Sequence, residues 1–158
     1  MKTAGDILIV DDESDIRLLI GATLRDEGFT TMEAASAMEA RDLLAAKPPG
    51  LAILDIWMRD SDMDGLELLE WVKSVYPEVP VLMISGHGTV ETAVQAIRNG
   101  AYDFIEKPFK EDRLLLMVQR AFEASRLERE NAELRARVSE ESDPSIIGVS
   151  TQIKAVRT

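Results

Sequence analysis

The chain has no cysteine, a single histidine and a shortage of basic residues. Its 158 residues include 18 Lys and Arg against 29 Asp and Glu, so the formal net charge is −11 at pH 7. Without cysteine, disulfide bonds and thiolate chemistry are excluded, and a reducing compartment such as the cytoplasm fits this composition. The excess of acid argues against nucleic-acid binding by this chain itself, because phosphate contacts require clustered Lys and Arg.

Long apolar runs are missing as well. No apolar stretch approaches the roughly 18 residues that a membrane helix needs, so we expect no membrane insertion. The N-terminal apolar run covers only residues 7–10 and is flanked by acidic residues, which is unlike a secretory signal peptide. The hydrophobic share of 46% is ordinary for a globular protein, and the length allows one domain with a core plus an extension.

Short β-like segments alternate with helical patterns over most of the chain. Between them, apolar residues recur with the helical period and stop at turn signals such as Gly28 and Asn99-Gly100. Apolar strands that alternate with helices are typical of a parallel sheet covered on both faces. We therefore predict an α/β fold with a doubly wound, flavodoxin-like sheet of five parallel strands in the order 2-1-3-4-5 and an extended C-terminal helix. The predicted strands are residues 7–10, 30–33, 51–54, 81–85 and 103–106.

The last predicted helix begins near Glu111 and continues past the point where such a domain would end. Apolar and small residues in it follow alternating three- and four-residue steps, a heptad pattern made of Ala124, Leu127, Asn131, Leu134 and Val138. A single Asn at an a position selects a two-stranded pair in register, so we predict a homodimer through this helix. A solvated single helix is the alternative, because two heptads are marginal alone.

Residues 140–145 interrupt the helical pattern, and a second helical period follows them. We therefore predict a domain over residues 1–122 and a helical, coiled-coil linker over residues 123–142. Residues 143–158 are too few to form a core, and they look like the start of a further domain that is cut off.

Acidic and basic side chains stand where the predicted strands end. Asp11 and Asp12 follow the first strand, Asp55 follows the third, and Lys107 follows the fifth. The carboxyl ends of parallel strands share one edge of a sheet, where such folds bind ligands. Two like charges about 4 Å apart repel by roughly 4 kcal/mol at an effective dielectric near 20, so clustered carboxylates require a positive partner. Besides Lys107, Mg²⁺ fits this role, because it prefers carboxylates, waters and phosphate oxygens.

Asp55 is the candidate nucleophile, because it stands alone at the end of the middle strand and an Asp carboxylate can form an acyl phosphate. Ser85, at the end of the fourth strand, and Lys107 would contact oxygens of the added phosphoryl group. Each residue also has a structural interpretation. Asp11 and Asp12 are good helix N-caps, and the other three could belong to plain turns. Their common place at strand ends favours the functional interpretation.

Two further patterns are not assigned to this site. The run Asp60–Gly65 opens like a calcium-binding loop, but its twelfth position is Trp71 instead of Glu. We expect a turn there, in which Asp64 caps the next helix. His87, the single histidine, lies between two glycines and is expected to be a surface residue rather than an acid–base catalyst.

Together these residues resemble the receiver domain of bacterial two-component response regulators. The resemblance rests on Asp11-Asp12 after ILIV, Asp55 after LAIL, Ser85-Gly86, Gly100-Ala101 and Lys107-Pro108-Phe109. It implies a signalling domain rather than an enzyme, with Asp55 as the acceptor of a phosphoryl group from a sensor histidine kinase. A stand-alone aspartyl-phosphate phosphatase is the alternative.

The resemblance also implies a role for each remaining site residue. Asp11, Asp12, Asp55 and the backbone carbonyl of Trp57 would bind Mg²⁺, while Ser85 and Lys107 would bind the phosphoryl group. Phe104 matches the switch aromatic of the family, which turns inward when the Ser or Thr moves. Phe replaces the more usual Tyr here, which keeps the packing but lacks the hydroxyl.

Residues 84–94 and 100–109 resemble the nitrogen-regulation subgroup of this family, the NtrC and NtrX type. Residues 146–157 resemble the entry to the AAA+ ATPase domain of sigma-54-dependent activators. By this resemblance, DNA and sigma-54 RNA polymerase would be contacted only through domains absent from this chain. One departure is the loop after Met58, where the usual proline is missing and two residues are added, as in NtrX-type receivers.

Overall fold

A computed structural model describes residues 6–58, 63–86 and 90–141, with side chains as far as residue 135. Five strands and five helices alternate along these residues. The strands are β1 (Asp6–Val10), β2 (Thr30–Ala34), β3 (Leu51–Asp55), β4 (Val81–Ser85) and β5 (Asp103–Glu106). The helices are α1 (Ser14–Asp26), α2 (Ala37–Ala46), α3 (Gly65–Val75), α4 (Val90–Arg98) and α5 (Glu111–Glu141). The strand segments predicted from the sequence are confirmed to within one residue at each end.

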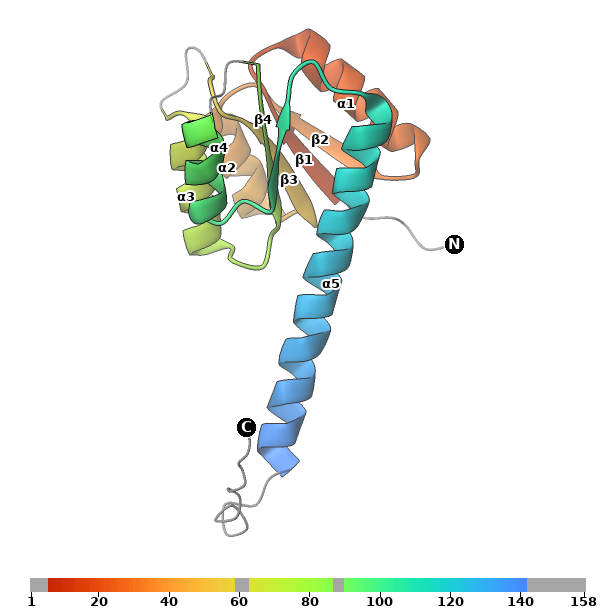
Figure 1. Ribbon diagram of the computed structural model, residues 1–158, viewed down its shortest axis with the longest axis vertical. Helices are drawn as coiled ribbons and strands as arrows, with labels where there is room; N and C mark the ends of the chain where they lie inside the picture. The colour runs from red at the N-terminus through yellow and green to blue at the C-terminus, as the bar shows by residue number, and fades with distance from the viewer. Residues whose placement is uncertain (1–5, 59–62, 87–89, 142–158) are drawn as a thin grey trace. The chain divides into compact units, whose positions relative to one another are not determined.

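The strands form one parallel sheet in the order β2-β1-β3-β4-β5, which confirms the predicted doubly wound topology (Figure 1). β1, β3 and β4 lie in the middle of the sheet, and all residues of β3 and β4 are buried. Strands that are covered on both faces have no solvent-facing side, which explains why their sequences are apolar without alternation.

Helices cover both faces of the sheet. On one face, apolar residues of α1 and α5 pack against Ile7, Ile53 and Ile84. On the other face, α2, α3 and α4 pack against Leu8, Leu54 and related residues of the same strands (Figure 1). Successive residues of each central strand therefore serve two separate core layers, which fixes the register of the sheet.

The helix ends follow local signals in the sequence. Gly28, after α1, has φ +94°, and Gly100, after α4, has φ +109°, so both adopt the left-handed conformation that favours glycine. Ser36 and Asp64 occupy the N-caps of α2 and α3 and accept hydrogen bonds from backbone N–H groups in the first turn. Each of these four residues therefore marks the start or the end of a helix.

The chain divides into a unit from Met1 to Ser125 and a second unit from Arg126 to Thr158. In the first unit, the Phe122 ring of α5 stacks on Phe29, with 5.5 Å between ring centroids. In the second unit, Leu127 and Leu134 are 51% and 55% exposed, which is compatible both with the predicted seam and with a solvated single helix. Among the described helices, none combines the length and the apolar character that a membrane span requires.

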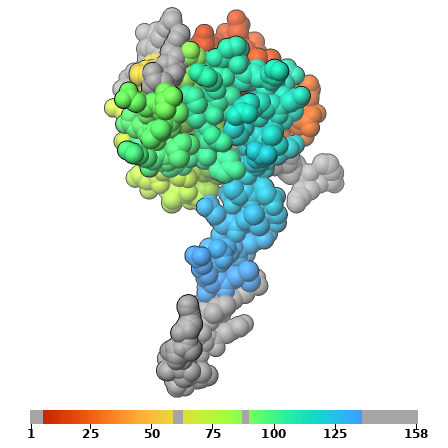
Figure 2. Space-filling view, viewed as in Figure 1, coloured from red at the N-terminus to blue at the C-terminus, as the bar shows by residue number. Residues whose placement is uncertain are grey.

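In the space-filling view, α4, β5 and the first part of α5 form one continuous face of the first unit (Figure 2). This face carries half-exposed apolar side chains, among them Val94, Ile97 and Tyr102. This face therefore presents several apolar side chains to solvent.

Candidate functional site

The carboxyl edge of the sheet brings together side chains from four separate segments of the chain. Asp11 follows β1, Asp55 ends β3, Ser85 ends β4, and Lys107 directly follows β5. Asp11 and Ser85 are fully buried and Asp55 is 3% exposed, although all three are polar. These residues are close together because the register aligns the ends of neighbouring strands: Asp55 lies beside Ile84, and Ser85 lies beside Glu106. The predicted juxtaposition of these residues is therefore present in the structure.

Lys107 is the positive centre of this group. Its Nζ atom lies 3.0 Å from Asp11 Oδ2, 3.1 Å from Glu13 Oε1 and 3.6 Å from Asp55 Oδ2. An ammonium group has three N–H donors, so it can serve all three carboxylates at once. The shortest distances are to Asp11 and Glu13, and the longest is to Asp55, which leaves the Asp55 carboxylate the least neutralised by Lys107.

Three carboxylates of this group could hold one metal ion. One oxygen from each of Asp11, Asp12 and Asp55 lies within 4.8 Å of the others. Asp11 Oδ2 is buried and lies 3.0 Å from the Lys107 ammonium group, which is its charged partner. The one positive charge of Lys107 does not balance three carboxylates, and buried charges are costly unless they are paired or bind a metal. Carboxylate oxygens at this spacing fit a hard divalent cation such as Mg²⁺.

Burial dominates the electrostatics of the cluster. Desolvation and the charge of Asp11 raise the pKa of Asp55 from 3.8 to about 7, although the positive charge of Lys107 opposes this. Burial likewise raises the pKa of Asp11. Burial alone would lower the pKa of Lys107, but the hydrogen bond to Asp11 and the charge of Asp55 outweigh it, so the net shift is upward. The cluster therefore holds a permanent ammonium group and two acids that gain from further positive charge.

A cleft of about 770 Å³ opens over these side chains, and Asp12, Glu13, Trp57 and Lys107 are among its lining residues. This space is large enough for a phosphoryl group with its metal and waters. The wall formed by α3 comes very close to β3. The Gly65 N–H donates to the Ile56 carbonyl at 2.8 Å, and a Cβ atom at Gly65 would overlap the Asp55 carbonyl oxygen. The glycine is therefore required for this close approach.

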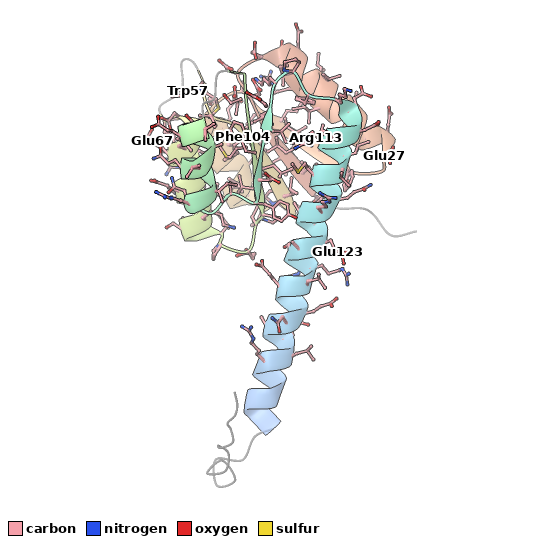
Figure 3. All side chains as sticks on the ribbon, in the orientation of Figure 1. Glu27, Trp57, Glu67, Phe104, Arg113 and Glu123 are labelled. Atoms are coloured by element: carbon pink, nitrogen blue, oxygen red, sulfur yellow. The ribbon has the colours of Figure 1, made fainter. Side chains whose placement is uncertain are left out.

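The remaining predicted site residues lie around the cleft. Trp57 is 48% exposed at its rim, and Figure 3 shows it in the loop that leaves β3. The backbone of Trp57 hydrogen bonds to the Asp55 carboxylate, whereas metal binding by its carbonyl stays a prediction. Phe104 lies beside Met83 in the sheet and is half-buried against the core layer that includes α4 (Figure 3). Ser85 is buried at the end of β4, and the next residue, Gly86, lines the cleft.

The structure also decides between alternatives left by the sequence. Asp11 and Asp12 do not occupy the N-cap of α1, which is Glu13. Asp64 caps α3 through a capping box with Glu67, and both hydrogen bonds of that motif are present at 2.9 and 3.0 Å. The helix-cap prediction for Asp64 is therefore confirmed. The predictions for residues 60, 62 and 87 lie outside the described residues.

Two residues of the site were not identified from the sequence. Glu13 contributes a fourth carboxylate through its contact with Lys107. Arg17 donates a hydrogen bond from Nη1 to the Asp11 carbonyl at 2.7 Å and pairs with Glu33 on β2 at 3.5 Å. Both lie within six residues of Asp11 along the chain. The position of Glu13 next to the acidic pair could have marked it as a candidate site residue. The sequence does not show, however, that its side chain is directed to Lys107.

Comparisons with known proteins agree with this geometry. Residues 7–119 match the model of the response regulator receiver domain. The nitrogen assimilation regulatory protein NtrX of Azorhizobium caulinodans is 56% identical over 132 residues, which are 84% of this chain and 29% of that protein. The chain thus spans about 30% of the length of the curated relatives it matches.

Two of the similar solved structures contain a receiver domain alone. The crystal structure of the receiver domain of NtrX from Brucella abortus has 57% identity and a TM-score of 0.73, and the match covers 75% of this chain and 98% of that one. The solution structure of the beryllofluoride-activated NtrC4 receiver domain dimer has 39% identity and a TM-score of 0.72, with coverage of 76% and 98%.

Proposed function

The chain belongs to the response regulator receiver domain family, with NtrX-type receivers among its relatives, and on this premise we propose that Asp55 accepts a phosphoryl group from a sensor histidine kinase. The observation that carries the proposal is the environment of Asp55. Its carboxylate is buried at the end of the central strand, faces the cleft with Asp12 and Lys107, and has a pKa near 7. We infer a signalling domain that is modified itself rather than an enzyme that turns over a substrate.

In the proposed step, an Asp55 Oδ atom attacks the phosphorus of a phosphohistidine. A P–O bond forms, the P–N bond breaks, and the imidazole nitrogen keeps the electron pair and takes up a proton. The transition state spreads negative charge over the equatorial phosphoryl oxygens. Lys107 lies 3.6 Å from Asp55 Oδ2 and can donate to one of these oxygens, and the Ser85 hydroxyl can donate to another.

A divalent ion held by Asp11, Asp12 and Asp55, with the Trp57 carbonyl, would supply positive charge that keeps Asp55 ionised and neutralises the incoming oxygens. We propose Mg²⁺, because its preferred ligands are carboxylates, waters and phosphate oxygens. The burial of Asp11 and Asp55, and the position of Asp12 with an oxygen within 4.8 Å of both, support this assignment.

The test is intact-mass measurement after incubation with a small phosphodonor and Mg²⁺, followed by peptide mapping. We expect one added phosphoryl group on Asp55, and none in the variant Asp55→Asn. Asp42→Asn is the matched control, since it makes the same acid-to-amide change on an exposed part of α2. Undiminished labelling of Asp55→Asn would place the acceptor elsewhere.

Phosphorylation adds a charge of about −2 and three acceptor oxygens at Asp55. We propose that Ser85 and Lys107 are drawn toward this group and that Phe104 then repacks, which shifts a two-state equilibrium of the surface formed by α4, β5 and α5. The half-exposed apolar residues on that surface, such as Ile97 and Tyr102, support its use in association.

We further propose that residues 123–142 link the receiver, residues 1–122, to an output region and pair two copies of the chain. The exposure of Leu127 and Leu134 on one heptad seam supports this pairing. Replacing Asn131 by Leu is expected to change the distribution of oligomers in sedimentation. A monomer for both proteins would remove the claim of a coiled coil. The predicted ATPase entry at 143–158 lies outside the described residues.

The curated relatives suggest what such an output does. They include the nitrogen assimilation regulator above and the C4-dicarboxylate transport transcriptional regulatory protein DctD of Rhizobium meliloti, which is 44% identical over 135 residues. We propose that this receiver controls transcription through a sigma-54-dependent ATPase and a DNA-binding domain, neither of which lies in this chain. The alternative of a stand-alone aspartyl-phosphate phosphatase receives no support from these relatives.

A further inference from the structure

Helix α1 starts with an unusual residue. N-cap positions favour Ser, Thr, Asp and Asn, whose short side chains accept a hydrogen bond from the first turn of the helix. α2 and α3 follow this preference with Ser36 and Asp64, and both make the capping bond. α1 has Glu13 at this position, in an extended conformation and without a side-chain capping bond. All three of these N-caps line the cleft, and Glu13 is the one among them whose side chain makes no capping bond.

The Glu13 carboxylate is directed to Lys107 instead. Its Oε1 atom lies 3.1 Å from Lys107 Nζ, nearly as close as Asp11 Oδ2 at 3.0 Å and closer than Asp55 Oδ2 at 3.6 Å. The backbone N–H of Glu13 also donates to Asp11 Oδ1 at 2.9 Å. The backbone of this residue therefore fixes Asp11, while its side chain fixes the ammonium group that must serve the phosphoryl group.

Departures from local preference are expected where a residue serves function at the expense of stability. We propose that Glu13 is a positioning residue: its carboxylate holds the Lys107 ammonium at the mouth of the cleft in the resting domain and competes for it with a phosphoryl group on Asp55. This inference rests on the proposed function. The contact stabilises the free state and is weakened in the modified state, so its removal must favour the modified state.

Two substitutions separate this contact from other effects of Glu13. Glu13→Gln removes the negative charge and keeps the length of the side chain. Glu13→Asp keeps the charge, but its side chain is one methylene shorter, so it retreats from Lys107 and gains the capping position over the first turn. Asp15→Asn is the control, because it removes an exposed charge in the same turn of α1.

Each protein, as the full chain, is titrated with beryllium fluoride in saturating Mg²⁺. The readout is tryptophan fluorescence in a Trp71→Phe background, which leaves Trp57 at the rim of the cleft as the fluorophore. Exposed ion pairs have modest strength, and the Glu13 side chain is 61% exposed, so we expect about two- to fivefold tighter binding in both Glu13 variants. Asp15→Asn is expected to bind as the wild type does. Thermal unfolding of the unliganded proteins should give a higher midpoint for Glu13→Asp, which a capping or purely structural role of Glu13 would not produce.

Three results would overturn the proposal. One is unchanged or weaker binding in both Glu13 variants. Another is tighter binding in Glu13→Gln but not in Glu13→Asp, which would assign the effect to charge rather than to the contact. The third is equal tightening by Asp15→Asn. By contrast, labelling of Asp55→Asn, or no binding of beryllium fluoride by the wild type, would count against the proposed function itself.

Discussion

Replacing Asp55 by Asn should stabilise the protein at neutral and alkaline pH when divalent cations are absent. Burial and the charge of Asp11 raise the pKa of Asp55 from 3.8 to about 7 in the folded protein. Between these two values, the unfolded chain releases a proton that the folded protein keeps. The free energy of unfolding therefore falls as the pH rises through this window and stays low above it. A difference of about three pKa units, at 1.36 kcal/mol each, amounts to about 4 kcal/mol.

The assay is urea unfolding of the wild type and of Asp55→Asn in EDTA, at pH 5 and at pH 8. Asn cannot ionise, so the advantage of the variant should grow by about 3 kcal/mol between these values, because about two of the three units fall in this interval. Asp42→Asn is expected to follow the wild type. Saturating Mg²⁺ should stabilise the wild type more than Asp55→Asn. If the free energy of unfolding has the same pH dependence in the wild type and in Asp55→Asn, the raised pKa of Asp55 is refuted.

Further predictions concern the metal, the wall of the cleft and the helix cap. Mg²⁺ at one hundred times its Kd should raise the free energy of unfolding by about 2.7 kcal/mol, seen as a higher Tm, and Asp12→Asn should reduce this gain. Gly65→Ala should cost about 1–3 kcal/mol in urea unfolding, because its Cβ would overlap the Asp55 carbonyl and lie 2.7 Å from Ile56 Cα. Asp64→Ala should cost about 1 kcal/mol by the same measurement, whereas Asp64→Ser should retain most of the cap. An unaltered midpoint in Gly65→Ala or Asp64→Ala would contradict the corresponding contact.

The topology of the sheet and the proximity of the site residues could both be predicted from the sequence pattern. Apolar strands such as 51–54 show no alternation because both faces of β3 are covered, and parallel strands place Asp11, Asp55 and Ser85 at one edge. The stop signals at Gly28 and Gly100 act locally, since they depend on the backbone conformation of a single residue. These features need no knowledge of side-chain packing.

Other features depend on distances that only the folded chain defines. The raised pKa of Asp55 comes from burial beneath neighbouring elements and from the charge of Asp11, which is remote in sequence. The contact between Glu13 and Lys107 joins residues 94 positions apart and depends on a rotamer choice. The close approach at Gly65 depends on how α3 enters beside β3. Local sequence patterns hold no information on these quantities. The location of the site could therefore be predicted from the sequence, but its distances and pKa values could not.

The position of Lys107 directly after the last strand has a consequence for the newly made protein. Asp11, Asp12 and Asp55 leave the ribosome well before the Lys107 amine, and Glu13, which also pairs with this amine, precedes it by 94 residues. A nascent chain that ends before β5 has the acids but lacks their counter-charge and the strand that places it. The proposed phosphoryl transfer to Asp55 therefore requires a segment that is made late, and a partly made chain is expected not to accept a phosphoryl group.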